Sequence, residues 1–278
     1  MTNLIDGKKI AKEKQEQIKK ELEQIKDKLS LAVIQVGNNP ASTIYVNNKK
    51  KLCERIGINF ILKKYETISQ KELEKEIEKL NKDKKITSIL VQLPLPKELD
   101  EKSIINKIDP LKDVDGLTTK NIGKLFAEED GIIPCTALGV LEMLKTKKIK
   151  LEGKDITIIG RSKLVGLPLV GLMLKENATV TVCHSKTKKL KEKTKTADII
   201  ISAAGCKDLV KKDMIKENAI IIDVGINRVD NKIYGDVKEN VKEKAKLITP
   251  VPGGVGPMTV TMLVNNVLKC YKLQKNKR

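Results

Sequence analysis

Strand-like and helix-like segments alternate along the chain, and this alternation is the feature that most restricts its fold. Apolar runs with the length of buried strands occupy 31–36, 58–62, 86–93, 155–159, 179–183, 198–202 and 219–224. Helical periodicity is found at 10–29, 70–81, 137–147 and 166–176. Because parallel strands are connected through helices, this order predicts an α/β fold with largely parallel sheets. A short hairpin is expected within 228–234, where Asp230-Asn231 forms the turn pair.

Two irregular stretches indicate how the chain divides. Its 278 residues are enough for two ordinary domains. Residues 109–135 contain several glycines and prolines, and residues 249–257 precede a final helical segment. We therefore expect a first domain at 1–137 and a second at 138–254. A C-terminal helix at about 255–278 is expected to return to the first domain.

The charge and the cysteines exclude several classes of protein. The net charge is +19, but the lysines are spread along the whole chain and alternate with glutamates, as at 72–85. A nucleic-acid-binding protein usually concentrates its charge and adds stacking aromatics, which make up only 2% of this chain. The five cysteines are widely spaced and His184 is the single histidine, so no metal site is expected. With no signal peptide and no long apolar run, we expect a soluble, cytoplasmic protein without a membrane partner.

A tyrosine and a lysine follow the first apolar run. After the turn at 38–40, residues 41–49 read as the start of a helix, which places Tyr45 and Lys49 one turn apart on one face. Sites in α/β proteins form where strands end, and a lysine there is a candidate general base. The alternative interpretation is a solvated lysine in a basic run with Lys50 and Lys51.

A second candidate site follows the run at 155–159. The residues Gly160-Arg161-Ser162-Lys163-Leu164-Val165-Gly166 come next, and a helix follows. Dinucleotides bind in this strand–turn–helix context, because a glycine allows the chain to approach a phosphate and the helix start offers free N–H groups. The spacing is not GxGxxG, so the turn by itself is weak evidence for a nucleotide.

The next strand indicates which nucleotide would bind. NAD enzymes place an acidic residue there for the ribose 2′-hydroxyl, whereas this chain has Ser185 and Lys186. Together with Arg161, these residues suit a 2′-phosphate and predict NADP rather than NAD. A basic surface loop is the alternative. His184 is a candidate base, but its place at the end of a cofactor strand favours a packing or adenosine-side role.

Several segments together resemble the bifunctional methylenetetrahydrofolate dehydrogenase/methenyltetrahydrofolate cyclohydrolase family. They are 41–49, 91–96 (VQLPLP), 112–116 (KDVDG), 160–162 (GRS), 184–187 (HSKT) and 250–259 (PVPGGVGPMT). The resemblance covers nearly the full length in family order. The Tyr/Lys and Pro-Gly-Gly segments are specific, whereas GRS alone is not.

The resemblance implies two linked reactions. Hydride passes from 5,10-methylenetetrahydrofolate to NADP, and the resulting 5,10-methenyltetrahydrofolate is hydrolysed to 10-formyltetrahydrofolate. In this family the lysine matching Lys49 is the key catalytic residue, and the tyrosine matching Tyr45 packs against the folate ring system. The glutamine matching Gln92 supports the lysine, and the aspartate matching Asp115 holds the pterin.

The remaining contacts are also implied by the resemblance. The positions that match NADP contacts are Gly160, Arg161, Ser162, Ser185 and Ile226. The loop with Gly253 and Gly254 matches one that lies along the folate. The chemistry agrees, because the methenyl carbon is already electrophilic and needs no metal. A cationic substrate also favours a neutral lysine amine, which can move protons.

The roles that the resemblance implies for Gln92 and Asp115 also agree with the chemistry of their side chains. Gln92 can hydrogen-bond the amine without adding charge, and Asp115 offers two acceptor oxygens to the donors of an aminopyrimidine edge. Loop capping or turn formation is the alternative for each residue taken alone.

From the resemblance we expect two α/β domains, an N-terminal catalytic domain and a Rossmann-like NADP-binding domain, with a cleft between them. It also implies a homodimer paired through the nucleotide domains, and a place in one-carbon metabolism and purine biosynthesis. Two alternatives stay open. A different NADP-dependent dehydrogenase, of shikimate or amino-acid type, explains the nucleotide half but not the four catalytic candidates together. A nucleic-acid-binding protein would use the +19 charge, and its affinity would fall steeply with salt.

Overall fold

The computed structural model describes residues 3–230 and 232–276, which form two compact units. The three-stranded unit comprises the described residues of Lys14–Cys135 and Val260–Arg278. The six-stranded unit comprises those of Met1–Glu13 and Thr136–Thr259. None of the helices in these described ranges combines the length and apolar character needed to cross a membrane.

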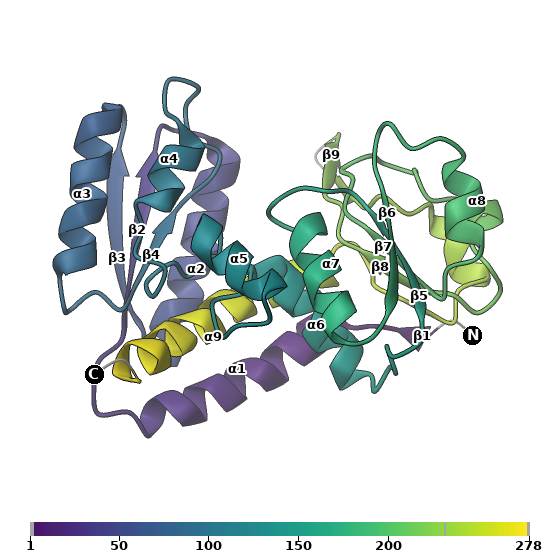
Figure 1. Ribbon diagram of the computed structural model, residues 1–278, viewed down its shortest axis with the longest axis horizontal. Coiled ribbons are helices and arrows are strands. Elements are labelled where there is room, and N and C mark those ends of the chain that lie inside the picture. The colour runs from purple at the N-terminus through teal and green to yellow at the C-terminus, as the bar shows by residue number, and fades with distance from the viewer. Residues whose placement is uncertain (1–2, 231, 277–278) are drawn as a thin grey trace. The chain divides into compact units, whose positions relative to one another are not determined.

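The three-stranded unit is built on a parallel sheet in the order β3-β2-β4 (Figure 1). Its strands are β2 (Ser30–Val36), β3 (Asn59–Tyr65) and β4 (Ser88–Val91). Every residue of β2 is buried, as expected for the central strand of a sheet covered on both faces. The helices of this unit are α2 (Pro40–Ile56), α3 (Gln70–Lys82), α4 (Glu101–Asn106) and α5 (Thr119–Phe126).

Helix α3 illustrates how the sequence produces these elements. Ser69 and Glu72 form a reciprocal capping box at its start, which satisfies N–H groups that the helix itself leaves free. Its apolar residues recur at helical spacing, and Leu73, Ile77 and Leu80 are buried against the sheet. The helix runs along the three strands in Figure 1.

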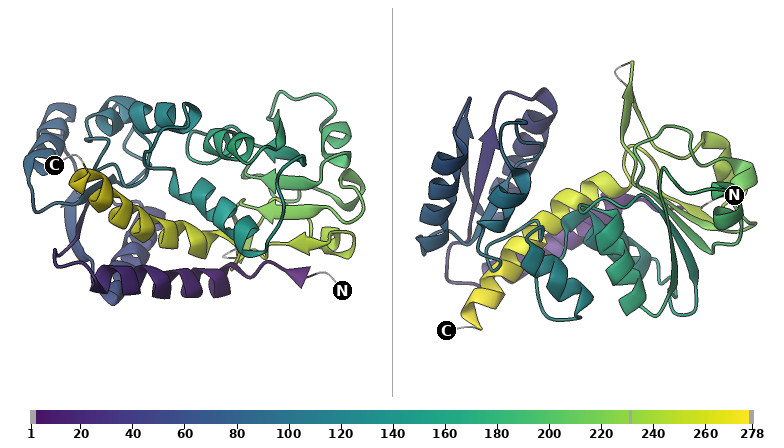
Figure 2. Two further views of the ribbon diagram at one scale, coloured as in Figure 1. Left: turned by 60° about the horizontal axis from the view of Figure 1, so that its bottom comes forward. Right: turned by 45° about the horizontal axis from the view of Figure 1, so that its top comes forward.

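The six-stranded unit contains a parallel sheet in the order β1-β11-β8-β7-β5-β6. Most of its strands are drawn in green in Figure 2. Its strands are β1 (Asn3–Leu4), β5 (Asp155–Ile159), β6 (Thr179–Cys183), β7 (Ile199–Ser202), β8 (Ile220–Asp223) and β11 (Leu247–Ile248). The order reverses direction on either side of β5, which creates the type of crevice where doubly wound sheets bind nucleotides. The predicted α/β class with parallel sheets is confirmed.

Helical elements before and between these strands complete the unit. They are α6 (Cys135–Thr146), α7 (Gly166–Lys175), α8 (Leu190–Lys195) and the short 3-10 helices at Lys212–Met214 and Glu239–Glu243. The expected hairpin is present as β9 (Asn227–Val229) paired antiparallel with β10 (Lys232–Tyr234). Its predicted turn residue Asn231 lies outside the described residues.

Each of the two units is made of two separate stretches of the sequence, so no single point divides the chain into domains. Strand β1 pairs with β11 in the six-stranded sheet, which the sequence did not predict because two residues carry no strand pattern. Helix α1 (Gly7–Glu23) and helix α9 (Val255–Lys275) each contribute residues to both units. The domain boundaries expected from the sequence therefore stay a prediction.

Candidate active site

Lys49 and Gln92 meet at the carboxyl end of the three-stranded sheet. Helix α2 starts just after β2, where the Asn39 side chain accepts a hydrogen bond from the N–H of Ser42 and caps the helix. Lys49 lies on this helix, one turn after Tyr45. Its Nζ donates to Oε1 of Gln92 at 2.9 Å, and Gln92 directly follows β4. The two side chains are therefore joined by a direct hydrogen bond.

The amide of Gln92 has a defined orientation. Its Nε2 donates to the carbonyl of Leu93 at 2.7 Å, so its oxygen is the atom left to face Lys49. The residue is 9% exposed, and its own N–H donates to Ile34 of the neighbouring strand. A buried, fixed amide oxygen holds the lysine amine in place without neutralising it. Tyr45, by contrast, is 38% exposed and its ring is accessible on the same helix.

Asp115 contacts a buried thiol, that of Cys135, which the sequence reasoning missed. The Cys135 thiol donates to Oδ1 of Asp115 at 3.4 Å. Burial raises the pKa of Cys135 well above its ordinary value, the charge of Asp115 raises that pKa further and the charge of Lys49 lowers it. Both charges therefore act on the same buried thiol. The only sequence signal was the position of Cys135 between Pro134 and Thr136, after the long irregular stretch.

Asn266 is a second residue that the sequence reasoning missed. It comes from helix α9 and is only 2% exposed. Its Nδ2 donates to the carbonyl oxygens of Val114 at 2.9 Å and Ile133 at 2.8 Å. These bonds fasten the segment before Asp115 to the segment before Cys135. A polar residue among the buried apolar positions of a helix was the available signal.

The neighbours of Asp115 in the KDVDG segment have structural roles. Asp113 is 1% exposed, and its carboxylate accepts bonds from the N–H of Thr118 and the amide of Asn121. Burial raises the pKa of this carboxyl. Lys112 is also buried and donates to two backbone carbonyls, those of Leu80 and Asp83. Asp115 is therefore the acidic residue of this segment that stays available to a substrate.

The predicted nucleotide turn lies at the carboxyl end of β5 in the six-stranded sheet. Gly160 has a φ of +121°, and a Cβ at this position would overlap the carbonyl oxygen of Ala203. A Cβ on Gly166 would in turn overlap the carbonyl oxygen of Gly160. Both glycines are therefore required by close backbone approach. At the start of α7, the Oγ of Ser162 accepts a bond from the N–H of Val165 at 3.2 Å, and its carbonyl oxygen accepts one from the N–H of Leu167 at 3.0 Å. The helix start therefore offers fewer free N–H groups to an anion than the sequence pattern predicts.

The other proposed cofactor residues lie along the same edge. Arg161 and Ser162 are exposed in the turn, and Ser185 is exposed after the neighbouring strand β6. Ile226 follows β8 and is 46% exposed. His184 stabilises its own turn, since its Nδ1 accepts a hydrogen bond from the N–H of Lys186 at 3.2 Å.

The Pro-Gly-Gly loop belongs to the six-stranded unit. Gly253 has a φ of +107° and accepts a hydrogen bond from the N–H of Lys8 at 3.1 Å. A Cβ on Gly7 would overlap the carbonyl oxygen of Gly254. Gly7 was not singled out from the sequence, although it lets the start of α1 pack directly on this loop.

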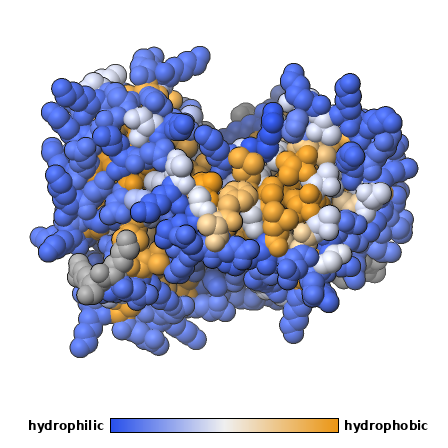
Figure 3. All heavy atoms as spheres, in the orientation of Figure 1, coloured by the Kyte–Doolittle hydropathy of each residue, from blue (hydrophilic) through white to orange (hydrophobic). Residues whose placement is uncertain are grey.

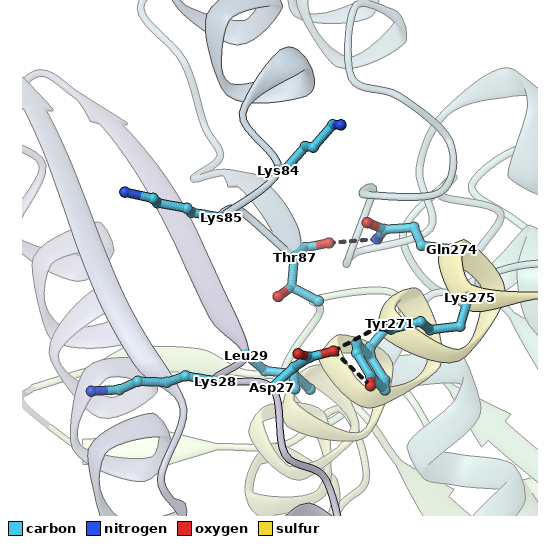
Figure 4. Close-up of a pocket in the computed structure, with 9 residues that line it drawn as sticks. All are labelled: Asp27, Lys28, Leu29, Lys84, Lys85, Thr87, Tyr271, Gln274 and Lys275. Atoms are coloured by element: carbon cyan, nitrogen blue, oxygen red, sulfur yellow. Dashed lines mark hydrogen bonds and ion pairs between the residues drawn. The ribbon is translucent and has the colours of Figure 1, made fainter. Parts of the chain in front are cut away.

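A hollow of about 300 Å³ lies at the opposite, amino end of the three-stranded sheet (Figure 4). Its lining residues are Asp27, Lys28, Leu29, Lys84, Lys85, Thr87, Tyr271, Gln274 and Lys275. Asp27 accepts bonds from Tyr271 and Lys275, whereas the amines of the other lysines point outward in Figure 4. Exposed lysines are expected anywhere on such a basic chain, so this hollow is not the candidate active site. Within 3–230 and 232–276, no cluster of three His, Cys, Asp or Glu side chains could hold a metal ion.

Comparison with known proteins gives a consistent result for both units. Residues 5–115 match the catalytic domain of tetrahydrofolate dehydrogenase/cyclohydrolase, and residues 134–275 match its NAD(P)-binding domain. The bifunctional protein FolD of Aquifex aeolicus is 53% identical over 98% of this chain and 96% of its own length.

Two solved structures are also similar. The bifunctional FolD methylenetetrahydrofolate dehydrogenase/cyclohydrolase of Campylobacter jejuni is 47% identical, with a TM-score of 0.96 over 99% of this chain and all of that one. The FolD enzyme of Trypanosoma brucei, solved with NADP cofactor and an inhibitor, is 37% identical. Its TM-score is 0.93, over 99% of this chain and 98% of that one.

Proposed function

The chain belongs to the tetrahydrofolate dehydrogenase/cyclohydrolase family, and on that basis we propose which of its residues carry out the two reactions. It is a bifunctional enzyme that oxidises 5,10-methylenetetrahydrofolate with NADP and hydrolyses the methenyl product to 10-formyltetrahydrofolate. The hydrogen bond from Lys49 to Gln92 at the carboxyl end of the sheet carries the assignment of the hydrolytic centre.

Lys49 is the proton-transfer residue of the hydrolysis. Its neutral amine takes a proton from water while the water oxygen bonds to the methenyl carbon. The resulting ammonium then returns a proton to the ring nitrogen as the bond between that nitrogen and the carbon breaks, and the added hydroxyl loses its proton to become the formyl carbonyl. One water is consumed and one proton is released, because the methenyl substrate carries a positive charge that the product lacks.

Gln92 and Asp115 orient the reacting groups. The fixed amide oxygen of Gln92 keeps the amine of Lys49 pointed at the substrate in both of its protonation states. Asp115 binds the aminopyrimidine edge of the pterin through its two carboxylate oxygens, and Tyr45 packs on the ring system. The loop with Gly253 and Gly254 contacts the folate.

The cofactor residues belong to the turns of the six-stranded sheet. NADP, when bound, accepts the hydride from the methylene carbon. Gly160 and the start of α7 receive the pyrophosphate, while Arg161 and Ser185 bind the 2′-phosphate. Ser162 and Ile226 contribute the remaining contacts of this set.

Replacing Lys49 tests the assignment of the hydrolytic centre. With methylenetetrahydrofolate and NADP, the unmodified protein should form NADPH and 10-formyltetrahydrofolate. Lys49→Ala should form the second product at least about 100-fold more slowly, the usual loss for a general base. Lys50→Ala is the matched control, because this neighbouring lysine only pairs with Glu54 at 3.8 Å on the exposed side of α2. Unchanged hydrolysis in Lys49→Ala, or equal losses in both variants, would contradict the proposal.

We further propose that the enzyme forms a homodimer through the six-stranded unit. Strand β6 is the edge of its sheet, and Val180 and Val182 on it are only partly buried. Leu167 and Leu174 lie two turns apart on one face of α7 and are 37% and 51% exposed. Figure 3 shows an apolar area over the part of the surface that carries α7. An unpaired strand edge beside exposed leucines favours pairing with a second copy.

The cellular setting follows from the reaction. The product carries a one-carbon unit at the formyl level, and we propose that it supplies purine biosynthesis in the cytoplasm. The even spread of lysines supports the absence of a nucleic-acid or membrane partner, and the charge instead favours anionic cofactors and substrates.

A further inference from the structure

Asp236 is a fully buried carboxylate held by uncharged donors. It lies just after the hairpin strand β10 and is 0% exposed. Its Oδ2 accepts bonds from the hydroxyl of Ser202 at 3.0 Å and from the N–H groups of Ala204 and Gly205 at 2.8 and 3.2 Å. Its Oδ1 accepts bonds from the N–H of Cys206 at 2.8 Å and from the amide of Asn227 at 3.1 Å. Three successive backbone N–H groups thus converge on one side chain.

A second buried carboxylate interlocks with the first. Oδ1 of Asp223, at the end of β8, accepts bonds from the N–H of Gly225 at 3.1 Å and of Asp236 at 2.9 Å. Its Oδ2 accepts a bond from Val237. A Cβ on Gly225 would overlap the carboxylate of Asp236, and a Cβ on Gly235 would overlap that of Asp223. The turn after β8 and the end of the hairpin are therefore fitted around this pair.

The positions of these loops along the sheet relate them to the cofactor. The strand order β8-β7-β5-β6 places the ends of these four strands in a row along one edge. Ser185 follows β6 and Gly160 follows β5, so a dinucleotide with its 2′-phosphate at Ser185 and its pyrophosphate at Gly160 extends toward β7 and β8. The loops after β7 and β8 are the two that Asp236 holds. The nicotinamide half of NADP would therefore meet these loops.

We propose that Asp236 is a positioning residue for hydride transfer, which holds the loop 203–206 and Ile226 in the conformation that receives the nicotinamide half of NADP. Ile226 lies between Gly225, which bonds to Asp223, and Asn227, which bonds to Asp236. This double anchoring explains how an isoleucine that is 46% exposed keeps a fixed place beside a cofactor. The inference rests on the proposed NADP site.

Replacing Asp236 with asparagine tests this role with almost no change in volume. Whichever oxygen becomes the amide nitrogen, its hydrogens face a backbone N–H, that of Cys206 on one side or those of Ala204 and Gly205 on the other. The loop must then rearrange, and we expect the Kd for NADP to rise by about tenfold or more, as for one buried bond lost. Hydrolysis of 5,10-methenyltetrahydrofolate, assayed without NADP, should stay within about twofold of the unmodified enzyme.

Asp198→Asn is the matched control. This carboxylate precedes β7 at the opposite end of the same sheet, where it accepts bonds from the N–H of Asp155 and from Lys216. The control should leave the Kd for NADP unchanged. If Asp236→Asn does not fold, Ser202→Ala removes a single donor to Asp236, and its Kd should rise several-fold with hydrolysis retained.

Each outcome decides the proposal. A raised Kd for NADP with retained hydrolysis supports it. An unchanged Kd for NADP in a folded variant, or a loss of hydrolysis as large as the loss of NADP affinity, overturns it and leaves Asp236 a purely structural residue. Absence of NADP binding by the unmodified protein would instead mean that the proposed cofactor site is wrong.

Discussion

Residues of the same type in the three-stranded unit differ in function because they differ in burial and bonding. Lys49 points to a glutamine at a sheet edge, whereas Lys112 is buried and bonded to two carbonyls. Asp115 is partly accessible beside a thiol, whereas Asp113 is enclosed by its own loop. The charge of a side chain does not by itself identify the reactive residue. The hydrogen-bond donors and acceptors around each side chain distinguish the reactive residue from the structural one.

Gln92→Glu should change the pH dependence of hydrolysis. A carboxylate at the same place, 2.9 Å from Nζ of Lys49, would stabilise the ammonium form and reduce the fraction of neutral amine. We expect a fall of roughly tenfold or more in hydrolysis near neutral pH, with partial recovery as the pH rises. Rates of formyl product formation measured between pH 6 and about 9 would show this shift. A uniform loss at every pH would mean that the glutamine acts only on substrate binding.

Asp223 should make the protein less stable as the pH rises above about 4. Burial, and to a smaller extent the charge of Asp236, raises the pKa of Asp223 from 3.8 to about 6. Between these values the folded state binds more protons than the unfolded state, so the contribution of Asp223 to the free energy of unfolding decreases with rising pH.

Denaturant unfolding at several pH values in this range measures whether the free energy of unfolding decreases with rising pH, as expected for Asp223. The part of this decrease that comes from Asp223 should be missing from Asp223→Asn, because asparagine does not titrate at this position. Asp213→Asn is the control, because the pKa of that exposed carboxyl lies below 3.8 and its titration falls outside the window. An identical pH dependence in the unmodified protein and Asp223→Asn would contradict the assignment.

Among the elements, the loops at the carboxyl end of the six-stranded sheet depend on close backbone contacts. The turn after β5 touches the loop after β7 at Gly160, and the start of α1 touches the Pro-Gly-Gly loop at Gly7. Such contacts leave no room for a side chain at the glycine, so the position of one loop depends directly on the position of the other.

Gly7→Ala should destabilise the protein more than other glycine replacements in helices. Its Cβ would overlap the backbone of Gly254, and overpacking of this kind costs about 1–3 kcal/mol or more. Gly123→Ala is the control, because this glycine lies exposed in α5 with no atom within 4 Å of an added Cβ. The control should gain about 0.5–1 kcal/mol from the better helix propensity of alanine. Free energies of unfolding from urea titrations would compare the two, and equal values would show that the α1 contact yields without strain.

At the scale of the whole molecule, the described part of the six-stranded unit has an edge strand, β6, and a partly exposed apolar face on α7. Leu174 and Phe126 are 51% and 49% exposed, and the helix that carries Leu174, α7, packs against the edge strand β6. Exposed apolar residues that occur singly need no partner, whereas those beside an open edge indicate an interface.

Leu174→Asp should weaken the proposed homodimer. A two-fold interface contains the substitution twice, so we expect the Kd for dimer formation to rise by about tenfold or more. Phe126→Asp, at the equivalent last turn of α5, is the control and should leave the oligomeric state unchanged. Sedimentation velocity over a range of concentrations would measure both. A monomeric unmodified protein, or a dimer unaffected by Leu174→Asp, would contradict the proposal.

The sequence by itself determined the α/β class, the placement of most strands and the candidate residues of both sites. Alternating apolar runs and glycine-rich turns are local patterns, and they report local structure directly. The contact of Lys49 with Gln92 was expected from the resemblance to the family, which is itself carried by short segments of the sequence.

Only the tertiary structure decided which residues support those sites. Asn266, Cys135, Gly7 and the Asp223–Asp236 pair make contacts with segments far away in the sequence. The pairing of β1 with β11 likewise joins the first described residues to a strand near the end of the chain. Such contacts depend on strand order and loop closure in three dimensions, which no periodicity along the chain encodes.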